Sequence, residues 1–177
     1  MGSTIKTATL IATMLILFSI IPLGTAQDHA LSYQLLNQPE GNVTYELNVV
    51  IPVDLHEFYL EQSHRLTSSS DFPTFVTPYV LQPIAGRLWE IYDDDEDFAN
   101  GVLMMVHQIT YVEIMPAKYP VETMVDGQGD CDLFSFIAAS VIKALVQAQI
   151  GALNGGRGCY YFEETGSRKI CLKTKVF

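Results

Sequence analysis

Basic residues are scarce in this chain of 177 residues. It contains ten Lys and Arg against twenty Asp and Glu, so its formal net charge is -10. A nucleic acid would be repelled by such a chain, because few cationic side chains are available to displace its counterions. The composition therefore argues against a nucleic-acid partner, and for the same reason it disfavours binding to anionic membrane surfaces.

Internal repeats and low-complexity tracts are also absent from the sequence. Apolar residues make up 49% of the chain, including nine Tyr and nine Phe. A chain of this length and composition can bury a sizeable core. We therefore expect one globular domain of ordinary size and not a disordered or repetitive protein.

Charge is missing altogether from residues 7–27, which follow Lys6. Their apolar centre ends in small residues before Gln27, a pattern typical of a secretory signal peptide cleaved after Ala26. Their length would also allow an uncleaved membrane anchor. We expect residues 1–26 to be a signal peptide or anchor and the protein to be exported, either secreted or held at the cell surface. Any membrane contact would then involve only an uncleaved N-terminal segment.

Cysteine is rare, with three in the chain. Cys159 and Cys171 flank the turn-forming run "EETGSRK", so they are predicted to pair across a hairpin in an oxidising compartment. Cys131 is left as the odd one. Two interpretations remain open for it: a reactive thiol, or a small buried residue at the edge of the core.

Residues 27–71 are predicted to form an N-terminal extension that contains β-structure. The run "NVTYELNVVIPV" alternates apolar and polar residues with the period of a half-buried strand. The run "DLHEFYLEQSHRL" has helical spacing, with Asp54 as its expected N-cap. A polar linker, "TSSSDFP", then leads to the main domain, expected over residues 72–177.

The acidic run "DDDED" at residues 93–97 has two interpretations. It follows a predicted helix over residues 77–92 and precedes another that carries Phe98, Val102, Met105 and Ile109 on one side. Five clustered acidic residues could bind calcium, but they lack the alternating ligands and central glycine of an EF-hand loop. We interpret them as capping residues that favour the positive end of the next helix. No cofactor is expected, and calcium remains only an alternative.

The sequence changes from a glycine-rich turn to a long apolar helix at Cys131. The run "VDGQGD" ends in Asp130, a strong N-cap residue, and an apolar stripe follows through Phe134, Ile137 and Val141. Cys131 would then lie in the first turn, where the helix dipole stabilises a thiolate. The adjacent carboxylates of Asp130 and Asp132 act against that effect.

The run "KYPVETMVDGQGDCDLFSFIAAS" resembles the cysteine-bearing segment of transglutaminase-like proteins, which belong to the papain-like superfamily. About 23 residues agree in order and spacing. "VLMMVHQITY" before it and "CYYFEETG" after it are similar to the neighbouring helix and to an aromatic strand of that family. The resemblance covers roughly residues 72–166.

This resemblance implies an α+β fold, with a papain-like transglutaminase core in which the helix bearing Cys131 is central and packs against an antiparallel sheet. It also implies a thiol hydrolase or acyltransferase that acts on amide bonds of a protein or peptide substrate. Cys131 takes the position of the nucleophile and Glu163 that of the carboxylate, with Glu164 as its neighbour. His107 or Gln108 is the candidate for binding the oxyanion. The alternative is an exported binding or cell-surface module that retains the fold without the chemistry.

Histidine is missing where the family carries its general base. All four His precede Cys131, the last being His107. The run "IGALNGGRG" between the cysteine helix and the aromatic strand is too short for two strands of about five or six residues. We therefore expect an incomplete transglutaminase-like domain, the product of truncation or a frameshift. Movement of His107 into the site, or a His from a second chain, would be the other ways to supply the base.

Overall fold

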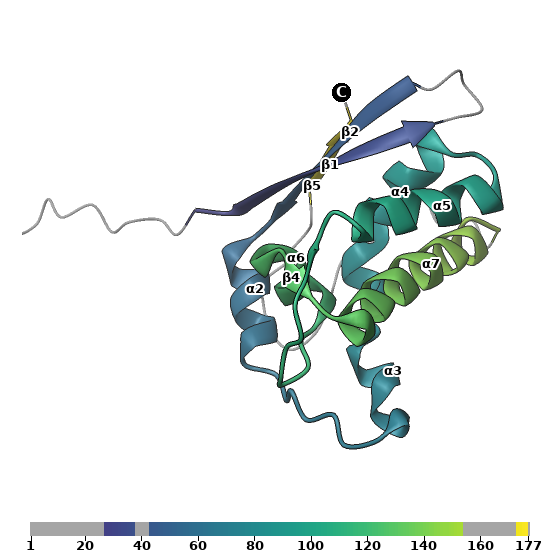
Figure 1. The fold of residues 1–177 in the computed structure, drawn as a ribbon. Coiled ribbons are helices and arrows are strands. Elements are labelled where there is room, and N and C mark those ends of the chain that lie inside the picture. The colour runs from purple at the N-terminus through teal and green to yellow at the C-terminus, as the bar shows by residue number, and fades with distance from the viewer. Residues whose placement is uncertain (1–26, 38–42, 154–172, 177) are drawn as a thin grey trace, which may run out of the picture.

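The structure, a computed structural model, describes residues 27–37, 43–153 and 173–176 and shows an α+β fold (Figure 1). Its first layer is an antiparallel sheet of β1 (His29–Asn37), β2 (Val43–Ile51) and β5 (Lys173–Val176), in the order β1-β2-β5. Alternate residues of β1 and β2 face the core. They are Tyr33, Leu35, Leu47, Val49 and Ile51. The half-buried strand predicted from the alternation is confirmed as β2.

Residues 27–71 share this sheet and core with the rest of the chain. β2 pairs with β5, which lies at residues 173–176. The helix predicted after β2 is α2 (Val53–Leu60), but Pro52 and not Asp54 occupies its N-cap, and Asp54 lies in the first turn. The fixed φ of Pro52 suits a helix start, so the helix begins directly after it. The expected polar linker, residues 67–73, contains a short 3₁₀ helix, η1 (Ser69–Asp71), and the first residues of α3 (Phe72–Phe75).

Two helices pack below the sheet, α4 (Pro78–Ile91) and α5 (Asp95–Val106). Pro78 stands at the start of α4, and Pro83 lies inside the helix. α5 ends at Val106, so the buried Ile109 lies beyond the helix that was predicted to contain it. The chain there turns into β3 (Thr110–Tyr111), which pairs in parallel with β4 (Gln128–Gly129).

The last two helices are α6 (Pro120–Asp126) and α7 (Cys131–Leu153). α6 ends at Gly127, whose φ of 62° is left-handed and therefore suits glycine. α7 packs mainly on α4 and also on α5 and α6. Among the described residues, α4 and α5 lie between α7 and the β1-β2-β5 sheet, so α7 has α4 and not this sheet as its main partner (Figure 1). The expected packing of the cysteine helix against an antiparallel sheet stays a prediction, because the predicted aromatic strand "CYYFEETG" lies outside the described ranges.

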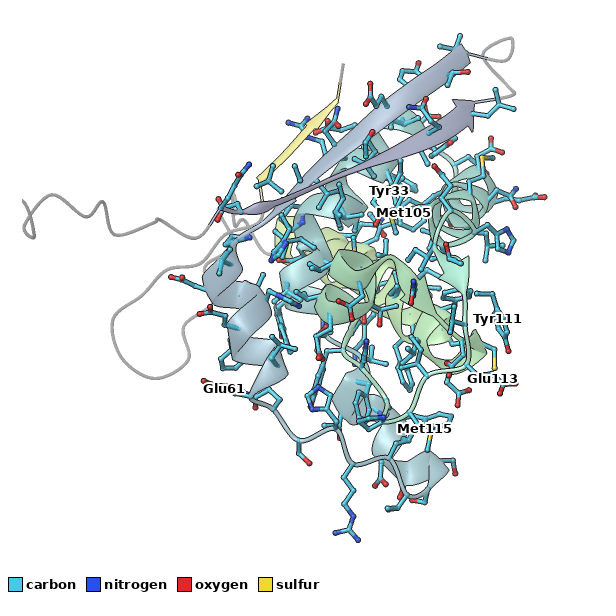
Figure 2. All side chains as sticks on the ribbon, turned by 60° about the vertical axis from the view of Figure 1, so that its left-hand side comes forward. Tyr33, Glu61, Met105, Tyr111, Glu113 and Met115 are labelled. Carbon is cyan, nitrogen blue, oxygen red and sulfur yellow. The ribbon has the colours of Figure 1, made fainter. Side chains whose placement is uncertain are left out.

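A single core joins the layers. Figure 2 shows Tyr33 of β1 and Met105 of α5 between the sheet and the helices, where both side chains are buried. Further core side chains come from α3, α4, α6 and α7: Phe75, Leu81, Ile84, Leu88, Met124, Leu133 and Ile137. Residues Cys131–Gln149 are long and apolar enough to cross a membrane, a test that core helices of soluble proteins also pass. In this structure α7 forms part of the core.

Candidate functional site

Asp130 holds the first turn of α7, as predicted. Its Oδ1 accepts hydrogen bonds from the backbone N–H groups of Asp132 at 3.2 Å and Leu133 at 3.1 Å. These bonds satisfy two of the N–H groups that lack partners at a helix start. Cys131 is the first residue of the helix and is exposed and unpaired. Cys131 is therefore not a small residue buried at the edge of the core, and its reactivity stays a prediction.

Gly129 makes the turn before Cys131 tight. A Cβ at this position would lie 2.9 Å from Thr123 Cγ2 and 3.0 Å from Phe134 Cε1, which is too close for carbon atoms. A side chain at this position would therefore have to displace Thr123 of α6 or Phe134 of α7. Gly129 thus allows α6 and α7 to pack closely just before Cys131.

The segment of residues 110–114 runs beside this turn. The N–H of Thr110 donates to Gly127 O at 3.0 Å, and the N–H of Val112 donates to Gly129 O at 2.8 Å. The N–H of Ile114 lies 3.4 Å from Asp130 Oδ2. Asp130 therefore caps the helix with one oxygen and contacts the neighbouring segment with the other.

Tyr111 lies next to the thiol. Its ring meets that of Phe134 edge to face, with centroids 6.2 Å apart, and 60% of the residue is exposed. The pKa of its hydroxyl is raised by partial desolvation and then by electrostatic interactions with Cys131 and Glu113, with smaller effects from Asp130 and Asp132. The thiol of Cys131 and the phenol of Tyr111 thus lie near the carboxylates of Glu113, Asp130 and Asp132.

The thiol makes few contacts of its own. Cys131 Sγ lies 3.9 Å from Asp132 Oδ1, and the backbone C=O of Cys131 accepts a 2.7 Å hydrogen bond from the hydroxyl of Ser135. No hydrogen bond among the described residues joins a histidine to Cys131. In this part of the chain no histidine is therefore placed to accept the proton of the thiol.

The two residues predicted to bind an oxyanion have other surroundings. His107 is exposed at the C-cap of α5 and lines a surface pocket of about 400 Å³ together with Tyr92, Asp97 and Asn100. The side-chain amide of Gln108 accepts from Gln34 N at 2.8 Å and donates to the C=O groups of Gln34 and Met104, both at 2.9 Å. Gln108 therefore binds the backbone of β1 at Gln34.

Sequence reasoning missed the pairing of His64 with Glu122. Nε2 of His64 lies 2.9 and 3.0 Å from the two carboxylate oxygens of Glu122, whose side chain is only 2% exposed. Glu122 Oε2 also accepts the N–H of Tyr119 at 2.8 Å. The order Tyr-Pro-x-Glu could have indicated a capping glutamate, but nothing around His64 in the sequence indicates its partner.

The acidic run acts as a cap, as predicted. Asp94 Oδ1 accepts from Glu96 N at 2.9 Å and from Asp97 N at 3.3 Å, and the acidic residues that follow lie in the first turn of α5. Their charges favour the positive end of the helix. In the described part of the chain, no group of three or more His, Cys, Asp or Glu is placed to hold a metal ion.

Several sequence predictions concern residues outside the described ranges. They are the signal peptide or anchor at residues 1–26, the carboxylate of Glu163 with its neighbour Glu164, and the disulfide between Cys159 and Cys171. These remain predictions.

No family model, curated protein or solved structure matches the chain.

Proposed function

We propose that Cys131 is the nucleophile of a thiol hydrolase or acyltransferase that acts on peptide or side-chain amides. The observation that carries this proposal is an exposed, unpaired thiol in the first turn of α7, with Asp130 fixing that turn. A helix start stabilises a thiolate, and exposure gives a substrate access to it. The resemblance of residues 72–166 to papain-like transglutaminases supports the same chemistry.

The reaction would proceed through a thioester. Cys131 Sγ bonds to the amide carbonyl carbon, the C–N bond breaks, and the amine leaves with the proton given up by the thiol. Water then attacks the thioester and yields a carboxylic acid, or a second amine attacks it and yields a new amide. Either attack restores the thiol.

Proton transfer from the thiol to the leaving amine needs a base, and within the described residues no histidine contacts Cys131. General acid-base help contributes about 10²–10⁴ in rate, and an amine leaves poorly without a proton. A second chain that supplied a histidine would complete the arrangement. Mixing catalytic variants tests this: Cys131→Ser mixed with a variant lacking all four His should regain activity if the base comes from a second chain.

Alkylation kinetics test whether Cys131 is activated. Iodoacetamide should label Cys131 faster than a free cysteine peptide near neutral pH, with the labelled site identified by mass spectrometry. Cys131→Ser should abolish release of amine from amide substrates. Labelling at the rate of the free peptide would overturn the proposal.

A second candidate function is an exported binding module without catalytic activity. The absence of a histidine contact to Cys131 within the described residues favours it. In this case Cys131→Ser would leave partner affinity unchanged and no amidase activity would be measurable. A large loss of affinity in the Ser variant would count against it.

Export is proposed on the sequence of residues 1–26 alone. A cleaved signal peptide predicts a mature protein that begins at Gln27, as measured by mass spectrometry of the intact secreted chain. A product that retains Met1 and sediments with membranes would instead support the anchor.

A further inference from the structure

Large apolar side chains are exposed along the segment that runs beside the start of α7. Tyr111 is 60%, Val112 38% and Met115 91% exposed. Tyr111, Glu113 and Met115 lie along one side of the molecule (Figure 2). Grouped apolar side chains that face water mark interaction sites more often than single ones do. We call residues 111–115 the 111–115 surface.

A free strand edge belongs to this surface. The N–H groups of Thr110 and Val112 both point to β4, where they bond to Gly127 and Gly129. Backbone groups alternate in direction along a strand, so the N–H and C=O of Tyr111 point away from β4. Within the described residues no strand pairs with that edge of β3. An unpaired edge can add an extended peptide as a further strand.

Among the described residues, the charged side chains that act on Tyr111 at this edge are acidic. Glu113 is exposed within the surface, and the exposed Asp132 and half-buried Asp130 lie at the adjacent start of α7. No Lys or Arg occurs between Arg87 and Lys118, or from there to Lys143. Lys118 itself is paired with Asp126. A ligand that covers this surface would therefore meet the negative charges of Glu113, Asp130 and Asp132.

We propose that the 111–115 surface binds an extended peptide that carries cationic and apolar side chains. Its backbone would pair with Tyr111 at the free edge of β3. Its apolar side chains would cover Tyr111 and Met115, and its Lys or Arg side chains would face Glu113 and Asp132. Charge complementarity selects this occupant, because an acidic peptide or an anionic lipid surface would be repelled.

That such peptides are substrates of Cys131 rests on the proposed function. Tyr111 contacts Phe134, one turn along α7 from Cys131, so a peptide on β3 would pass close to the thiol. The binding step itself needs no thiol. It can therefore be measured in the full-length Cys131→Ser protein, in which any reaction is blocked.

Peptide binding is the test. The probe is a fluorescein-labelled nine-residue peptide of alternating Leu and Lys, compared with one of alternating Leu and Glu and one of alternating Ser and Lys. Fluorescence anisotropy should show the Leu/Lys peptide binding at least about tenfold more tightly than either of the others. Its affinity should fall as salt is added, because the contacts are exposed.

Matched variants locate the binding site. Glu113→Lys and Met115→Ser should each weaken binding by roughly fivefold, the effect expected of one exposed charge or apolar contact. Glu61→Lys, at an exposed position on the other side of the molecule (Figure 2), should leave binding unchanged, as should Leu60→Ser. N-methylation of the peptide amides that pair with β3 should weaken binding. N-methylation of the alternate amides should leave binding unchanged, because those amides would point away from β3.

The outcomes separate this inference from the proposed function. Equal affinity for the Lys and Glu peptides, no binding at millimolar peptide, or equal effects of Glu113→Lys and Glu61→Lys would overturn it. Light scattering that showed a dimer dissociated by Met115→Ser would assign the surface to a second copy and overturn it as well. Tight Leu/Lys binding without any amine release by the unmodified protein would retain the peptide surface and reject the catalytic proposal.

Discussion

Nε2 of His64 lies 2.9 and 3.0 Å from the two carboxylate oxygens of Glu122, although 58 residues separate them in the chain. The pair ties the segment after α2 to α6, the helix that leads into the turn before Cys131. The hydroxyl of Tyr119 adds a second tie by donating to Ser63 O at 3.2 Å. The start of α6 is therefore held by contacts from residues 63–64.

Loss of the hydrogen bonds between His64 and Glu122 should destabilise the fold. In His64→Leu the nearly buried carboxylate of Glu122 loses its histidine partner, and hydrogen bonds to charged groups contribute about 1.5–3 kcal/mol. We expect a loss of that order in the free energy of unfolding, measured with urea. The loss should be smaller in a Glu122→Gln background, where the group left behind is neutral. Equal losses in both backgrounds would contradict this explanation, and the exposed His107→Leu serves as control.

Gln108 should protect the edge of β1. Its side-chain amide bonds to both the N–H and the C=O of Gln34, as a neighbouring strand would. Gln108→Ala should lower the free energy of unfolding by about 1 kcal/mol and speed hydrogen exchange at the Gln34 amide. His107→Ala, at the adjacent exposed position, should change neither. Unaltered exchange at Gln34 in Gln108→Ala would reject this role.

Two helical glycines should respond in opposite directions to replacement by alanine. A Cβ on Gly101 would lie 2.3 Å from Cε2 of the Tyr92 ring, whose hydroxyl donates to Leu36 O at 3.1 Å. Gly101→Ala should therefore cost about 1–3 kcal/mol through overpacking. Nothing lies within 4 Å of a Cβ on Gly86, so Gly86→Ala should stabilise α4 by roughly 0.5–1 kcal/mol. Thermal unfolding measures both, and a stabilising Gly101→Ala would show that Tyr92 can move aside.

Asp71 should make stability depend on acidic pH. Backbone and side-chain hydrogen bonds from Thr67, and then the N–H of Ser68, hold the pKa of its carboxyl below the ordinary value of roughly 3.9. The folded state thus favours the ionised form. The resulting stability is present above that ordinary value and is lost as pH falls through the lower pKa of the folded state.

Asp71→Asn should therefore flatten the pH dependence of unfolding below about pH 4. The measurement is a series of urea titrations between neutral and acidic pH, with the exposed Glu57→Gln as control. A profile identical to that of the unmodified protein would show that the carboxylate keeps the same hydrogen bonding in the unfolded chain.

Local sequence signals were sufficient for the elements whose cause is local. The alternation in β2, the apolar stripe of α7 and the caps at Asp94 and Asp130 follow from side-chain period and from backbone N–H groups without partners. The first turn of α7 could be placed at Cys131 for that reason. Asp54 failed as a cap because Pro52, two residues earlier, had already set the start of α2.

Only the tertiary structure decided which faces of these elements meet. The sequence determined that Cys131 begins a helix, that negative charge surrounds it, and that no histidine follows it. Folding decided that α4 and α5 separate α7 from the sheet, that Gln108 holds β1, and that His64 pairs with Glu122 and not with the thiol. These pairings depend on contacts between residues distant in the chain, and neither hydrophobic period nor residue spacing encodes such contacts.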